Sequence, residues 1–185
     1  MSNPFEAVWN TLKTTIDNTN EPKSPLNIIE AGDCWMYLTM VEEFIRYEEI
    51  GLNTTTDDEI REMLTDVIRI CESQVRRLSD FMKQEGIPLP DATSAKPNSD
   101  SNQIPLGVKL TDDEIANGIA FKLVNCMLTC AKSQADALRH DIGMLWVQFH
   151  SEWVSFGTTL KVLMRKRGWL KVPPYYYPPG SPQQT

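Results

Sequence analysis

The sequence lacks both a long hydrophobic run and an amino-terminal export pattern. No apolar stretch approaches the roughly 18 residues that a membrane-spanning helix requires, so we expect no membrane span. Residues 1–6 contain neither the basic nor the apolar segment of a secretory signal peptide. We therefore expect a cytoplasmic protein without a signal peptide, or one that is delivered from the cytoplasm without translocation.

The sequence also has fewer basic than acidic residues. The 185 residues include 18 Lys and Arg against 25 Asp and Glu, which gives a formal net charge of −7. This charge repels a phosphate backbone, so we expect no nucleic-acid partner. The one basic concentration lies within residues 161–171, at the end of an expected helix, where cations complement the helix dipole. The length suits a single domain over residues 1–185.

Histidine is scarce, which limits metal chemistry. The two histidines are His140 and His150. A two-metal site in a helical bundle needs Glu-x-x-His pairs, whose members project side by side into the bundle. Ala137 and Val147 stand where those glutamates would be. Phosphate-binding loops and nucleophile elbows are absent as well, so we expect no catalytic residues and no cofactor.

The four cysteines form no Cys-x-x-Cys pair, which structural zinc sites commonly use. In a reducing cytosol they should remain thiols. We interpret them as small buried hydrophobic residues, with a four-thiolate zinc site as the alternative. They are Cys34, Cys71, Cys126 and Cys130.

Helical periodicity dominates the rest of the chain. Phe5, Val8, Trp9, Leu12 and Ile16 predict a short accessory helix within residues 1–20 that packs on the outside of a bundle. Four longer helices follow, as two hairpins over residues 26–84 and 111–168.

Capping patterns give the expected helix ends. Thr56 with Glu59 and Thr111 with Glu114 predict two capping boxes. Asp141 predicts the N-cap of the last helix. Expected stops are Gly51, which ends the first bundle helix near Glu49, and then Gly86 and Gly168.

The two hairpins are joined by a long connection without helical periodicity. Residues 85–110 contain prolines at positions 88, 90, 97 and 105. About 25 extended residues reach roughly 80 Å, whereas a helix of about 28 residues is roughly 42 Å long. The connection can therefore run the length of a bundle. We predict an all-α, ferritin-like four-helix bundle with one long crossover between its second and third helices.

The apolar stripes leave little room for a metal site. The last helix presents Trp146, Phe149, Trp153 and Phe156 at steps of three and four. In the first bundle helix the stripe is expected to pass through Ile28, Ala31, Trp35, Leu38 and Ile45, with Glu42 between the last two. The second presents Cys71-x-x-Gln74 at the position that a Glu-x-x-His would take in a two-metal bundle. If a metal site exists, its candidate ligands are Glu42, Glu72 and His150.

Residues 169–185 form an expected extended tail, rich in proline and tyrosine. Such a segment can bind another protein at low ordering cost. Alternatively, it folds back and its tyrosines cover the end of the bundle.

Three motifs carry a resemblance to a known family. They are the opening Leu110–Ile115, the closing Lys166–Leu170 followed by Pro173–Tyr175, and the stop at Glu85–Pro90. Together they resemble ferritin-like helical proteins of Bacillus-type spore-forming bacteria, some described as spore coat proteins and related to the coat protein F type. The resemblance covers about residues 26–178. It implies a ferritin-like bundle without an established enzyme activity, and it transfers no catalytic residues.

The sequence therefore favours a non-enzymatic structural or interaction protein associated with the spore coat or sporulation. Its expected partners are proteins, spore coat components and a second copy of the chain among them. The alternative is a ferritin-like metal-binding or oxidoreductase protein with an atypical site. A small-molecule pocket between the bundle and the amino-terminal helix is also left open.

Overall fold

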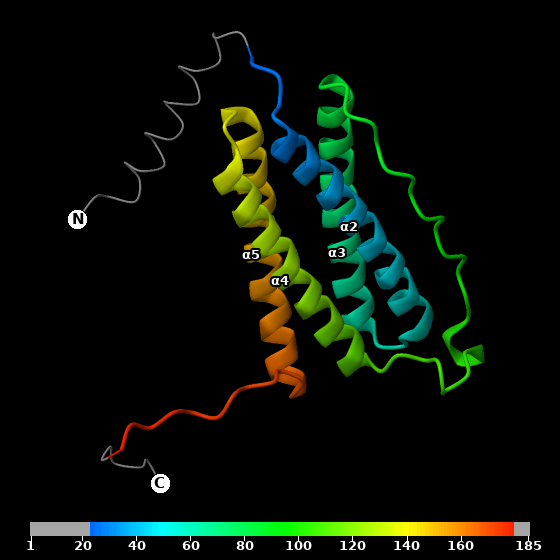
Figure 1. Ribbon diagram of the computed structural model, residues 1–185. Helices are drawn as coiled ribbons and strands as arrows, with labels where there is room; N and C mark the ends of the chain where they lie inside the picture. The colour runs from blue at the N-terminus through cyan, green and yellow to red at the C-terminus, as the bar shows by residue number, and fades with distance from the viewer. Residues whose placement is uncertain (1–22, 180–185) are drawn as a thin grey trace.

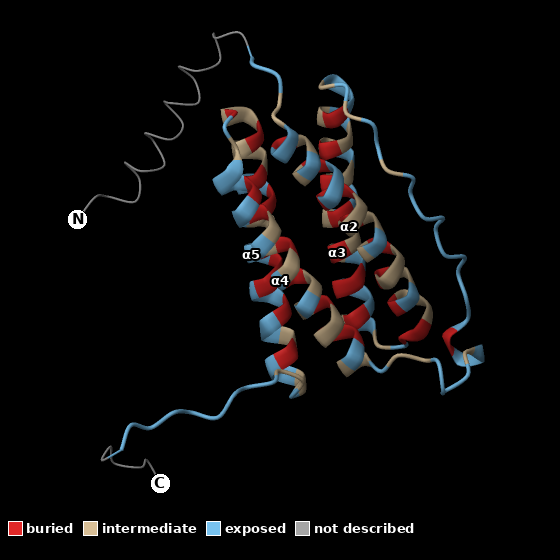
Figure 2. Cartoon of the chain, in the orientation of Figure 1, coloured by how far each residue is buried: buried red, intermediate tan, exposed pale blue. Residues whose placement is uncertain are grey.

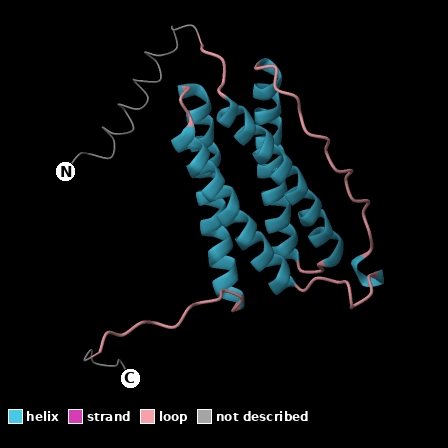
Figure 3. Ribbon diagram, viewed as in Figure 1, coloured by secondary structure: helices cyan, strands magenta, loops and turns pink. Residues whose placement is uncertain are grey.

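The computed structural model describes residues 23–179 as an all-α unit, which confirms the predicted class (Figures 1 and 3). The long helices are α2 (Ile28–Thr54), α3 (Asp58–Gln84), α4 (Asp112–Asp136) and α5 (His140–Arg167). A single 3-10 turn, η2 (Ser101–Gln103), lies between α3 and α4, and this part of the chain contains no strand. The accessory helix predicted within residues 1–20 lies outside the described residues. None of the described helices has the length and apolar content of a membrane span.

The four helices pack as two antiparallel hairpins, α2 with α3 and α4 with α5. Across the hairpins, α2 lies beside α4 and α3 beside α5. Lys132 of α4 pairs with Asp33 near the start of α2, and Lys122 pairs with Glu48 near its end, so α2 and α4 are antiparallel. We call the end where α2 and α5 begin the upper end, and the opposite end, at Gly168, the lower end (Figure 1).

The connection between α3 and α4 runs from the upper to the lower end, beside α2 (Figure 1). Asn53 anchors it twice, because its amide donates to the Pro97 carbonyl (2.9 Å) and accepts from the Ser99 amide (2.9 Å). The Lys96 amide also donates to the Glu49 carboxylate (2.7 Å). Residues 86–110 thus span the length of the bundle, and α4 starts at the end opposite to where α3 stops.

The buried residues lie along the four helices (Figure 2), and aromatic side chains of α5 form much of this interior, as predicted from their spacing. Trp146, Phe149, Trp153 and Phe156 are all buried. Tyr37 of α2 packs its ring edge to face against Trp146, with centroids 5.1 Å apart, and stacks on Phe149 at 5.7 Å. Such pairs contribute more than their buried area alone.

The buried face of α2 differs from the predicted stripe. Ile28 is 89% exposed and Trp35 is 38% exposed, whereas Leu38 and Ile45 are buried as expected. The prediction failed because apolar side chains stand on both faces of α2 and acidic side chains stand on the inner one, which blurs the periodicity. The buried positions are Glu30, Cys34, Tyr37, Leu38, Val41, Ile45, Glu48, Gly51 and Thr54.

Gly51 does not end the first bundle helix. It lies inside α2, which continues to Thr54. A Cβ atom at position 51 would stand 3.1 Å from both methyl groups of Leu64 on α3. The glycine therefore allows close approach of the two helices, a requirement that a single sequence does not distinguish from a stop.

Two predicted caps are displaced and one is confirmed. Asp57, rather than Thr56, caps α3, with its side chain accepting from the Ile60 amide (3.2 Å). The N-cap of α5 is Arg139, not Asp141, and it forms no side-chain cap. Asp141 instead lies in the first turn, where a carboxylate complements the helix dipole. The capping box of Thr111 and Glu114 is present at α4.

Candidate functional site

Hydrogen bonds cross the centre of the bundle and connect three of its helices. Trp153 donates its indole N–H to the Tyr37 hydroxyl (2.7 Å), and this hydroxyl donates to Gln74 Oε1 (2.7 Å). The Gln74 amide in turn donates to Glu152 Oε2 (2.8 Å). Arg77 binds both oxygens of Glu152, at 2.8 and 2.7 Å. We call these five residues the central network. It pairs the buried groups and ends at a half-exposed ion pair.

The central network lies in the interior of the bundle, between facing helices. A two-metal site needs inward-facing carboxylates and histidines. Here the inward side chains of Tyr37 and Gln74 are a phenol and an amide, which satisfy each other. Within residues 23–179, no three His, Cys, Asp or Glu side chains converge as metal ligands would.

The three candidate ligands lie on different helices. Glu42 is half-buried on α2, where burial raises its pKa, and Glu72 is exposed on α3. His150 is half-buried on α5 and lines a recess of about 130 Å³ between α4 and α5, together with Cys130 and Trp146. The described structure does not bring them together into a ligand set.

The cysteines are buried thiols rather than nucleophiles. Burial raises the pKa of Cys34 and of Cys130 to about 12. Burial also raises the pKa values of Cys71 and Cys126. Nucleophilic attack requires the thiolate. At neutral pH these side chains therefore act as small packing groups.

A second polar pair, which sequence reasoning missed, lies closer to the lower end. Glu48 of α2 is 1% exposed, and its Oε1 stands 3.5 Å from Lys122 Nζ of α4. The ammonium also lies over the rings of Tyr47 (3.6 Å) and Phe44 (4.7 Å), an arrangement that favours the cation. The only signal in the sequence is that Glu48 follows Val41 by seven residues, on the same helix face.

Burial dominates the electrostatics of this pair. It raises the pKa of Glu48 to about 7, although Lys122 acts in the opposite direction. The same burial lowers the pKa of Lys122. Glu48 Oε2 has no hydrogen-bond partner among the described residues. Glu48 is thus the interior carboxyl whose ionisation changes near neutral pH.

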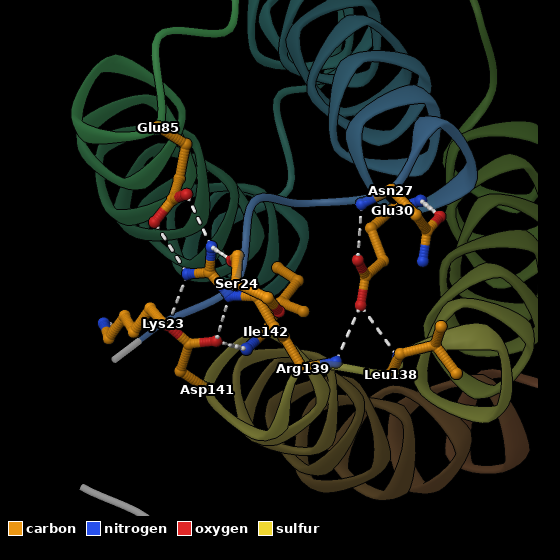
Figure 4. A network of polar contacts seen from close by, with 9 residues as sticks. All are labelled: Lys23, Ser24, Asn27, Glu30, Glu85, Leu138, Arg139, Asp141 and Ile142. Atoms are coloured by element: carbon orange, nitrogen blue, oxygen red, sulfur yellow. Dashed lines mark hydrogen bonds and ion pairs between the residues drawn. The ribbon is translucent and has the colours of Figure 1, made fainter. Parts of the chain in front are cut away.

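A third cluster joins the helices at the upper end (Figure 4). Arg139 forms a two-pronged ion pair with Glu85 at the end of α3 (2.6 and 2.7 Å). It also binds Asp141 (2.7 Å) and donates to the Ser24 carbonyl (3.0 Å). Lys23 completes the cluster through Asp141 (2.9 Å). One guanidinium therefore ties α3, α5 and the segment before α2.

Glu30 closes the turn between α4 and α5. Its Oε1 accepts from the backbone amides of Leu138 (2.7 Å) and Arg139 (2.8 Å), while its Oε2 accepts from the Asn27 amide (2.9 Å) (Figure 4). The carboxylate thus binds the two backbone amides that directly precede α5. The capping box predicts only the contact of Glu30 within its own helix. Its hydrogen bonds to the turn before α5 cannot be predicted from the local sequence.

Comparison with known proteins places this architecture in a family. The model of DUF3231, described as a protein of unknown function, matches residues 14–181. The chain belongs to the DUF3231 family. The uncharacterized protein YvdQ of Bacillus subtilis (strain 168) is 28% identical over 157 residues, which cover 85% of this chain and 92% of YvdQ.

Solved structures resemble this DUF3231 chain as well. A putative spore coat protein of Bacillus halodurans C-125 matches with a TM-score of 0.81 and 26% identity, over 83% of this chain and 97% of the other. A DUF305 fragment from Deinococcus radiodurans has a TM-score of 0.63 at 12% identity, over 77% of this chain and 99% of the fragment, which shows a likeness of fold alone. The predicted resemblance to proteins of Bacillus-type bacteria, a putative spore coat protein among them, is confirmed.

The buried Glu48 predicts a pH dependence of stability. Its pKa is about 7 in the folded protein against a model value of 4.5. The folded state therefore binds the proton more tightly, and this stabilisation is complete below pH 4.5 and lost as the pH rises through 7. We expect the free energy of unfolding to fall by about 2–3 kcal/mol from this group between pH 5 and 8. The Glu48→Gln variant should lack this part of the slope in urea titrations. Parallel pH profiles of the variant and the natural protein would contradict the assignment.

Proposed function

We propose that this chain is a non-enzymatic structural or interaction protein that is associated with the spore coat. The observation that carries the proposal is the likeness in both structure and sequence to the putative spore coat protein of Bacillus halodurans. The match extends over nearly the whole of that chain, so it concerns the complete bundle rather than a shared hairpin.

We further propose that the bundle is ferritin-like. The support is its connectivity, because two antiparallel hairpins joined by one long crossover are the arrangement of ferritin-like folds. The crossover between α3 and α4 and the antiparallel neighbours described above agree with this order.

The interior supports a structural rather than a chemical role. The polar groups of the central network form hydrogen bonds with one another, and burial keeps the thiols protonated. Glu48 changes its ionisation near neutral pH, but it is 1% exposed, so a substrate has no direct access to its carboxyl group. A protein of this kind acts through its surface.

The carboxyl-terminal segment supports protein partners. Tyr175 and Tyr176 are 79% and 83% exposed, directly after Pro173 and Pro174. Proline-rich segments with accessible aromatic rings bind protein grooves with little loss of conformational entropy. In this proposal the tail is the strip through which the bundle contacts coat components.

The spore association predicts a location. A fluorescently tagged copy, expressed in a sporulating Bacillus host, should concentrate in the developing spore and co-purify with the coat fraction. A matched copy with Tyr175, Tyr176 and Tyr177 changed to serine should leave the bundle folded and lose at least half of that enrichment. Uniform signal in vegetative cells with none in spores would overturn the proposal. If the serine variant is enriched in spores as strongly as the natural protein, the tail is not the segment that contacts coat components.

We also propose that two copies pair through the outer face of α4. Phe121, Val124 and Leu128 are exposed at successive turns, and Asn117 and Asn125 beside them carry no charge. Depletion of charge around aromatic and aliphatic side chains is typical of interface cores, and a twofold pair buries the same patch on both copies.

Light scattering tests the pairing. The natural protein should have twice the mass of one chain, and Phe121→Glu should have the mass of one chain because the charge would be buried at the interface. Phe121→Leu, which keeps the face apolar, should remain a dimer. A monomeric natural protein would refute the pairing.

A further inference from the structure

An apolar groove lies between α3 and α5, towards the lower end. It has a volume of about 650 Å³, and its floor consists of Met63, Ile70, Phe156 and Leu163. Val162, on its α5 wall, is 62% exposed. Among the neighbouring helix pairs of the bundle, α3 and α5 contact each other least. The groove is therefore a part of the bundle surface that the described residues leave uncovered.

Within residues 23–179, the side-chain hydrogen bonds and ion pairs that join α3 to α5 lie above and below the groove, so the helices stay apart between them. Above it, Gln74 and Arg77 bind Glu152. Below it, Arg167 binds Asp57 and Glu59 (2.8 Å to Asp57). Between these ties, α5 presents the short side chains of Ser155 and Thr159, which do not fill the space between the helices.

The chain enters the bundle on this same side. Lys23 pairs with Asp141 at the start of α5, and the Ser24 carbonyl accepts from Arg139, which also binds Glu85 at the end of α3 (Figure 4). The first described residues thus lie over the upper end of the α3–α5 pair. Residues 1–22 continue from that point.

The length of the preceding segment matches the distance to the groove. Along α5, Ser155 lies about 21 Å and Lys166 about 38 Å below Asp141, at 1.5 Å per residue. Residues 19–22 can cover up to about 17 Å from residue 18 to Lys23 when extended. A helix over residues 4–18 would add about 21 Å, which places its first residue about 38 Å from the anchor.

We propose that residues 4–18 form a helix that occupies the α3–α5 groove, running parallel to α3. Its apolar face, with Phe5, Val8, Trp9, Leu12 and Ile16, supplies the large side chains that the groove lacks. In this register Leu12 and Ile16 lie over Ile70 and Phe156, and Phe5 and Trp9 lie over Met63 and Leu163. The amino-terminal segment is then a fifth helix of the fold, and the groove is not a surface for another molecule.

Photo-crosslinking of the full chain tests this occupant. Trp9 is replaced by p-benzoylphenylalanine, and the products are mapped by mass spectrometry after irradiation. We expect intramolecular crosslinks to peptides that contain Met63, Ile70 or Leu163. The matched control places the same photoreactive residue at Thr11, about 200° around the helix from position 9, and should give no crosslink in the groove.

A second variant tests whether the position 9 crosslink depends on the groove rather than on another part of the surface. Val162→Glu changes an exposed side chain, so it should fold, and it should lower the yield of the position 9 crosslink at least fivefold. A covalent dimer would assign the groove to a second copy instead. Crosslinks from position 9 to other faces, no crosslink at all, or a yield unchanged by Val162→Glu would each overturn the proposal.

Discussion

The structure depends on the pairing of the polar side chains that the bundle buries at its centre. Tyr37, Gln74 and Trp153 come from three different helices, and each would lose the free energy of its hydration without a partner inside. Their hydrogen bonds at 2.7 Å pair them with one another. Since the bonds connect both hairpins, they also specify one alignment of the helices along the bundle axis. A shift by one turn would leave the phenol, the amide and the indole unpaired.

The other polar clusters act on the same alignment from different positions. Arg139 joins α3 to α5 at the upper end, and Arg167 joins them at the lower end. Glu48 and Lys122 join α2 to α4. A connection that runs the whole length of the bundle places few restraints on how the second hairpin docks, because long loops tolerate many end separations. The side-chain pairs between hairpins therefore supply most of the specificity.

Much of the fold could be predicted from local patterns, and little of the site could. Three features depend on neighbours within one helix and could therefore be predicted from local sequence. They are the aromatic stripe of α5, the stop at Gly86 and the capping box at Thr111. The partners of Glu48 and Gln74 lie on other helices, and those of Glu30 lie in the turn between α4 and α5. For Glu30 and Glu48 the separation along the chain is 74 residues or more. In the sequence, a buried acidic residue looks like a break in the apolar pattern, because its partner on another helix is not known. For that reason the predicted stripe of α2 included the exposed Ile28 and Trp35, and Glu42 was considered in place of Glu48.

In this DUF3231 bundle one long crossover joins the two hairpins, and hydrogen bonds of the central network connect three helices across the interior. We propose that this interior holds the helices together and binds no metal. Elemental analysis of the full chain, purified after growth with added iron, manganese and zinc, tests it most directly. We expect well under one equivalent of each metal per chain. One or more equivalents that survive gel filtration would contradict it.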